Sequence, residues 1–157
     1  MSNGRSRRDS RPDSLPFGLA GKLPPQNLEA EQGVLGSLLL QNETIDEVAE
    51  VLQPQHFYSD SHQRIYRAIM GLHERGVRGI DPVTLYNEIS RNNEAEDIGG
   101  ADYLTEILEA VPHAAHARYY ADIVRDRWIQ RSLTYACTEI LTECYEGGEE
   151  TEDVLAS

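Results

Sequence analysis

Residues 114–145 read AAHARYYADIVRDRWIQRSLTYACTEILTECY, and this stretch predicts one long α-helix that decides the fold. No proline interrupts it, and its apolar residues recur at spacings of three and four, which is typical of one apolar helix face: Tyr120, Ile123, Val124, Trp128, Leu133, Ala136, Ile140, Leu141 and Cys144. Some thirty helical residues span about 45 Å, whereas a domain of about 100 residues has a radius of gyration of about 13 Å. We therefore expect much of the helix to protrude and its apolar face to need a covering helix, later in the chain or in a partner.

The charge of the chain is unevenly distributed. The 157 residues carry a net charge of −13, but residues 1–22 hold five basic and two acidic side chains, a net +3, so that the rest carries −16. An acidic body repels a phosphate backbone, which disfavours specific DNA binding by this domain and favours a basic protein partner. The length suffices for one domain with an arm or tail.

The two cysteines do not predict a disulfide. Cys137 and Cys144 lie seven residues apart on the expected helix, about 10.5 Å along its axis, which is too far for a bridge. We expect both to be buried small apolar residues in a reducing compartment. The sequence contains no apolar run of about 20 residues and no secretory signal in residues 1–22, which indicates a cytoplasmic protein without membrane contact.

The N-terminal tail, residues 1–22, is rich in polar residues, arginine, glycine and proline and is expected to be disordered. The first helix follows, with Asn27 as its N-cap and the carboxylates of Glu29 and Glu31 in its first turn, where the helix dipole favours them. Gly33 and Gly36 weaken a helix, so their presence predicts a neighbouring backbone packed closely against it.

Further helices are predicted up to Pro112. No stretch alternates between apolar and polar residues for long enough to indicate a β-strand. Thr44 and Glu47 have the spacing of a capping box, Asp60 is placed to cap the next helix, and Gly76 is placed to stop it. Asp81 is predicted to be the N-cap of another helix, and Pro82 is predicted to be the first residue of that helix. Residues 92–100 are polar and glycine-containing, which predicts a loop.

An ordered series of short motifs resembles the N-terminal domain of bacterial hexameric replicative helicases, the DnaB family. The opening of that series is residues 23–40, LPPQNLEAEQGVLGSLLL. The series continues, in order, with His56-Phe57-Tyr58, a helix holding His62, Ile65, Tyr66, Ala68 and Ile69, then Asp81 with Thr84-Leu85, Gly99-Gly100 with Tyr103-Leu104, and residues 119–125. The resemblance covers about residues 23–146, and its specificity lies in the set rather than in any one motif.

This resemblance implies an all-α fold: a small bundle of five to six helices at 23–112, and a long protruding helix at 113–146 that forms the first arm of a truncated helical hairpin. Residues 147–157 are then a turn and the start of the second arm. The implied function is a collar and interaction domain that associates with itself, as a dimer or higher and as a hexamer in the full-length parent. It docks the C-terminal region of a DnaG-type primase, with a helicase loader as a further partner. ATP and Mg²⁺ are expected only for a motor domain outside this fragment, which itself is expected to hold no cofactor or metal and to catalyse nothing.

No catalytic group is indicated by the residues themselves. His113 and His116 are expected to be solvated at a helix start, and His56 and His62 to pack or cap. Arg125, Arg127 and Arg131 are expected to pair with Asp122, Asp126 or other nearby acids. For Trp128 two interpretations stay open, completion of the core or anchoring of a partner. The predicted subunit or primase interface comprises Trp128, Arg131, Leu133, Ile140, Leu141 and Cys144.

Two other function classes stay open. The C-terminal helicase-binding domain of a primase has a similar helical architecture, but is not expected to begin with the motif of residues 23–40. A helical DNA-binding regulator is disfavoured by the −16 charge of residues 23–157.

Overall fold

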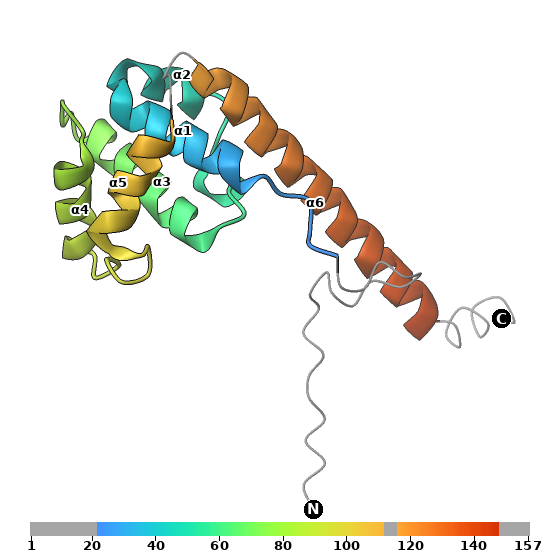
Figure 1. Cartoon of the computed structure of the whole chain (residues 1–157). Helices are drawn as coiled ribbons and strands as arrows, with labels where there is room; N and C mark the ends of the chain where they lie inside the picture. Colours follow the sequence, from blue (N-terminus) through green and yellow to red (C-terminus); the bar gives the residue numbers. More distant parts are fainter. Residues whose placement is uncertain (1–21, 112–115, 148–157) are drawn as a thin grey trace, which may run out of the picture. The chain divides into compact units, whose positions relative to one another are not determined.

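The computed structural model describes residues 22–111 and 116–147, and within these residues every regular element is a helix (Figure 1). In chain order the elements are α1 (Leu28–Leu40), η2 (Asn42–Thr44), α2 (Ile45–Ala49), η3 (Pro54–His56), α3 (Asp60–Glu74), α4 (Pro82–Arg91), α5 (Gly100–Ala110) and α6 (Ala117–Glu146). The predicted all-α fold with a long C-terminal helix is therefore confirmed. The predicted tail up to residue 21, His113, and the expected second hairpin helix at 148–157 lie outside the described residues.

The chain divides into two compact units, Gln26–Trp128 and a second unit that combines Met1–Pro25 with Ile129–Ser157. Helix α6 has 30 residues and contributes to both units. The helix is described from Ala117 on, and its expected start at 113–114 lies within residues 112–115, which are not described.

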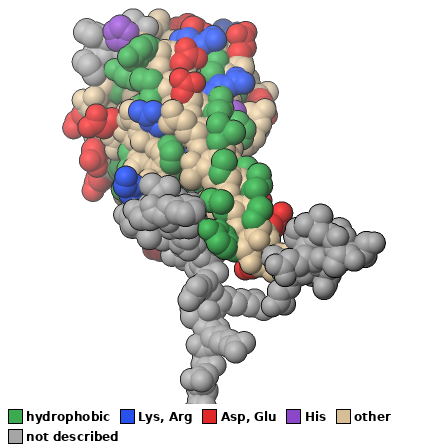
Figure 2. All heavy atoms as spheres, turned by 90° about the vertical axis from the view of Figure 1, so that its right-hand side faces the viewer, with side chains coloured by type: hydrophobic (Ala, Val, Ile, Leu, Met, Phe, Trp, Pro, Cys, Tyr) green, Lys and Arg blue, Asp and Glu red, His purple; other side chains and the backbone are tan. Residues whose placement is uncertain are grey.

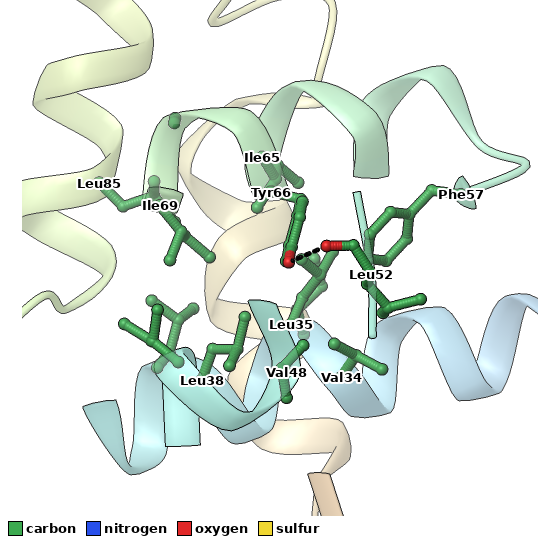
Figure 3. Packing of buried hydrophobic residues seen from close by; sticks show 14 of the residues in the cluster. Val34, Leu35, Leu38, Val48, Leu52, Phe57, Ile65, Tyr66, Ile69 and Leu85 are labelled. Atoms are coloured by element: carbon green, nitrogen blue, oxygen red, sulfur yellow. Dashed lines mark hydrogen bonds between the residues drawn. The ribbon is translucent and has the colours of Figure 1, made fainter. Parts of the chain in front are cut away.

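Helix α1 forms the centre of the Gln26–Trp128 unit, where it packs against α3 and α5 (Figures 1 and 3). Its inward side chains are fully buried, among them Val34, Leu35 and Leu38. Tyr66 on α3 closes the core beside Phe57, with ring centroids 5.0 Å apart, and its hydroxyl donates a 2.9 Å hydrogen bond to the carbonyl oxygen of Leu52 (Figure 3). Burial of this phenol raises the pKa of Tyr66 to about 12.

The two glycines of α1 lie where neighbouring elements come closest. A Cβ at Gly36 would lie 2.7 Å from the carbonyl oxygen of Ile107 in α5 and 2.4 Å from Cγ2 of Val111. A Cβ at Gly33 would lie 2.9 Å from the ring of Tyr120 in α6. The expected close approach is confirmed at Gly36 as contact with backbone, whereas at Gly33 the neighbour is an aromatic ring.

Two of the predicted N-caps are confirmed. The side chain of Asn27 accepts a 2.9 Å hydrogen bond from the backbone N–H of Ala30, and that of Asp81 accepts a 2.8 Å bond from Thr84. Bonding to that N–H holds the pKa of Asp81 below its usual value. Gly76 adopts a φ of +78° just after α3, as its predicted role as a stop requires.

Two other predicted caps are wrong. Ser59 rather than Asp60 caps α3, because its hydroxyl accepts from the His62 N–H at 3.4 Å, while Asp60 instead binds Arg64 Nε at 2.7 Å. The Thr44 hydroxyl caps nothing, because it donates back to the carbonyl of Gln41 at 2.8 Å.

Candidate interaction surface

Helix α6 carries a buried face on its first half. Ala117, Ala121 and Val124 are each at most 2% exposed and belong to the core of the Gln26–Trp128 unit. Their spacing of four and three keeps them on one side of the helix. At the end of this half, the half-buried Trp128 packs on the ring of His56, with centroids 4.4 Å apart. This half of α6 is thus an ordinary core helix.

The second half of α6 exposes large apolar side chains. Leu133 is 61% exposed, Ile140 59% and Ile129 39%. Hydrophobic side chains accordingly follow one another along α6 on the molecular surface (Figure 2). A set of exposed aliphatic residues along one helix is characteristic of a surface that another protein segment covers.

The apolar residues of α6 therefore form two faces rather than the single face predicted from sequence. An α-helix turns about 100° per residue, so the five-residue step from Trp128 to Leu133 rotates the apolar positions by about 140°. Ile129, Leu133, Ala136 and Ile140 lie within about 60° of each other, on the side away from Val124. The sequence pattern joined these two sets because both use spacings of three and four.

The expectation that the cysteines are buried is wrong, because Cys137 and Cys144 are both exposed. They lie at the edge of the outward apolar set, because Cys137 is about 60° and Cys144 about 40° around the helix from Ile140, on the same side of it. Leu141, by contrast, is half-buried. The thiols are thus surface groups of the second half of α6.

Arg125 and Arg131 of α6 donate to backbone carbonyls, which the sequence did not predict. Arg131 is only 5% exposed, and its guanidinium donates a 2.9 Å hydrogen bond to the carbonyl of Pro25 in the same unit. Arg125 donates to the carbonyl of Val51 at 3.4 Å. Asp122 is bound instead by Arg118, at 3.3 Å. A buried guanidinium can satisfy its donors with carbonyls, which the spacing of charges along a helix does not reveal.

A buried polar network links three helices of the Gln26–Trp128 unit, and sequence reasoning missed it. Glu31 and His62 are each 1% exposed, with Oε1 of the carboxylate 2.8 Å from Nδ1 of the ring. Nε2 of His62 lies 2.5 Å from the hydroxyl of Tyr103, which also accepts from Gln32 Nε2 at 3.3 Å. A neutral imidazole with its proton on Nδ1 satisfies every one of these groups.

The carboxylate of Glu31 has a further task in this network. Its two oxygens accept from the backbone N–H groups of Tyr58 at 2.9 Å and Ser59 at 3.2 Å. The expected place of Glu31 in the first turn of α1 is confirmed, and its carboxylate also points inward and fixes the start of α3. His62 is likewise more than a packing group, whereas His56 does cap, its Nδ1 accepting from the Gln53 N–H at 2.9 Å.

The described residues contain no cluster of three or more His, Cys, Asp or Glu side chains placed to hold a metal ion. His116, which the sequence placed at a helix start, is exposed there. Within the same residues, no helix is both long enough and apolar enough to span a bilayer.

Comparison with known proteins agrees with this helical architecture. Residues 23–126 match the family model of the DnaB-like helicase N terminal domain. The replicative DNA helicase DnaC of Bacillus subtilis (strain 168) is 44% identical over 138 residues, which are 88% of this chain and 30% of that protein. The chain thus spans less than a third of the length of that curated relative.

Two solved structures share the fold. The N-terminal domain of DnaB helicase from Mycobacterium tuberculosis is 43% identical with a TM-score of 0.76, over 80% of this chain and 86% of that one. A DnaB-like replicative helicase, described together with its interactions with primase, is 26% identical with a TM-score of 0.63, over 82% of this chain and 31% of that one.

Proposed function

The chain belongs to the DnaB-like helicase N-terminal domain family, and from this premise we propose that it is the collar and interaction domain of a hexameric replicative helicase. Its part in DNA replication is then organisational: it joins subunits and docks primase. ATP hydrolysis, Mg²⁺ binding and strand separation belong to a motor domain outside these residues, since the Bacillus relative is a replicative helicase of which the match covers 30%.

The observation that carries this proposal is the outward apolar face of α6. Ile129, Leu133 and Ile140 together offer an aliphatic surface that water contacts unfavourably. A second helix, from the same chain or from another subunit, covers such a face by inserting side chains between these residues. In this arrangement Trp128 and Arg131 act from the opposite side, by fixing α6 on its own chain.

Primase docking rests on a different argument. The relative described with its interactions with primase shares the fold at 26% identity. The strongly acidic character of residues 23–157 suits a basic partner surface. We place the primase contact on the second half of α6, and we include in it the half-buried Leu141 and the exposed Cys144.

Light scattering on the purified chain tests the self-association. Leu133→Asp and Ile140→Asp each place a charge among aliphatic side chains, so we expect either variant to lower the measured mass to that of a monomer. Val83→Asp is the matched control, because Val83 is 70% exposed on α4, outside α6. An unchanged mass in both α6 variants contradicts the proposal, as does dissociation in the control.

Titration of the primase C-terminal region into the same three variants tests the second contact. We expect loss of binding in Leu133→Asp and Ile140→Asp but not in Val83→Asp. Full binding by a monomeric α6 variant would place the primase site elsewhere on the domain.

A further inference from the structure

A groove of about 380 Å³ lies between the start of α1, the end of α5 and the first half of α6, all within the Gln26–Trp128 unit. We propose that this groove binds a lysine or arginine side chain from a basic segment of a partner protein. The proposal does not depend on how α6 pairs with another helix, because the outward apolar face is not part of the groove.

The wall of the groove suits the aliphatic stem of such a side chain. Val111, Tyr120 and Ile123 border it with apolar surface. The absence of a side chain at Gly33 brings the Tyr120 ring against α1, since a Cβ there would lie 2.9 Å from the ring. Long basic side chains bury their methylene groups along such surfaces, and a cation gains further from an aromatic ring nearby.

The rim of the groove suits a cationic head. Glu29 is exposed at this rim, and within the described part of the chain it makes no ion pair. Helix α5 ends at Ala110, which also lines the groove, so the partial negative charge of that helix end is directed toward it. Among the described residues that line the groove, Glu29 is the charged side chain. Its carboxylate and the end of α5 together give the groove a negative potential.

The charge of the whole chain favours a partner protein as the source. Residues 23–157 carry a net −16, which draws a basic segment toward this domain. A volume of about 380 Å³ lies near the lower end of the range for ligand sites, about 300–1,000 Å³, which fits one long side chain rather than a folded element.

The proposal is tested by nuclear magnetic resonance on the ¹⁵N-labelled 157-residue chain. The probe is an acetylated and amidated Leu-Arg-Leu tripeptide, and its control is the same peptide with citrulline, the neutral isostere, in place of arginine. We expect saturable shifts of the amide signals of Gly33, Val111 and Ile123 with the arginine peptide only. Equal binding of the citrulline peptide, or shifts spread over the acidic surface without saturation, overturns the proposal.

A matched pair of variants locates the charge that matters. Glu29→Gln removes the carboxylate at the rim, and we expect it to weaken the arginine peptide about 3- to 10-fold, as loss of a charge-assisted hydrogen bond does. Glu47→Gln removes an equally exposed carboxylate from α2 and is expected to leave the affinity unchanged. Equal effects of the two variants overturn the site, because they show only general attraction to an acidic surface.

The basic tail of the chain is a competing occupant. It is tested by changing Arg5, Arg7, Arg8 and Arg11 to glutamine in the full chain. Unchanged groove signals support a site open to a partner, whereas shifts of Gly33 and Ile123 without peptide show that the tail fills the groove and overturn the proposal.

Discussion

Replacement of Gly36 by alanine should destabilise this protein, although alanine is the better helix former. The new Cβ would lie 2.4 Å from Cγ2 of Val111 and 2.7 Å from the carbonyl oxygen of Ile107, where ordinary contacts need at least 3.4 Å. Val111 can rotate away, but the Ile107 carbonyl moves only if α5 moves. Overpacking of this kind costs about 3 kcal/mol at the upper end of its usual range, and the gain in helix propensity offsets about 1 kcal/mol.

The expected net loss is therefore about 2 kcal/mol, or about 8–16 °C in Tm for a domain of this size. Gly71→Ala is the matched control, because Gly71 lies inside α3 with nothing within 4 Å of its Cβ position. The control should gain about 1 kcal/mol, so that urea unfolding followed by circular dichroism separates the two variants by about 3 kcal/mol. If Gly36→Ala unfolds at the same urea concentration as the parent or higher, the close approach of α1 and α5 does not constrain this position.

Two further predictions concern buried polar groups. Because burial raises the pKa of Tyr66 to about 12, the unfolded chain loses its phenolic proton first, above about pH 10, so the free energy of unfolding should fall by about 2–3 kcal/mol between pH 10 and 12 and be unaffected by this group below pH 10. Tyr66→Phe should lack this part of the alkaline slope in urea titrations at both pH values, and an identical slope would refute the assignment. Glu31→Ala leaves His62 and two backbone N–H groups without their buried acceptor and should cost about 3–5 kcal/mol. Glu31→Gln retains an oxygen acceptor and should cost less, so equal unfolding midpoints for Glu31→Ala and Glu31→Gln would contradict the reasoning that a retained oxygen acceptor satisfies these buried donors.

The fold was predictable from sequence because its determinants are local or periodic. The caps at Asn27 and Asp81 bond to N–H groups three residues along the chain, which spacing alone identifies. Gly33 and Gly36 either simply weaken the helix or permit close packing, and the structure shows close neighbours at both positions. The unbroken apolar pattern of residues 114–145 predicted the long final helix, and the structure contains it as α6.

The polar network was not predictable, because its partners are distant in sequence. Glu31 looks like an ordinary first-turn carboxylate until the fold brings His62 within 2.8 Å of it, 31 residues later in the chain. Arg131 finds the carbonyl of Pro25, which lies 106 residues away. Periodicity reports which side of a helix is apolar, but not which polar groups meet inside.

The interaction surface was only partly predictable. The sequence correctly indicated exposed aliphatic residues at Leu133 and Ile140, yet it assigned them to the same face as Val124 and placed the cysteines inside. A five-residue step is invisible to a search for spacings of three and four, although it turns the helix by about 140°. The contact partners of this surface stay a prediction.

The network of Glu31, His62 and Tyr103 also limits how such a domain can diverge. Each of the three side chains is hydrogen-bonded to at least one of the others, so replacing one leaves a buried polar group without a partner. Loss of the acid leaves the imidazole and also the backbone N–H groups of Tyr58 and Ser59 without their acceptor. Among related chains, single replacements at these three positions should therefore be rare.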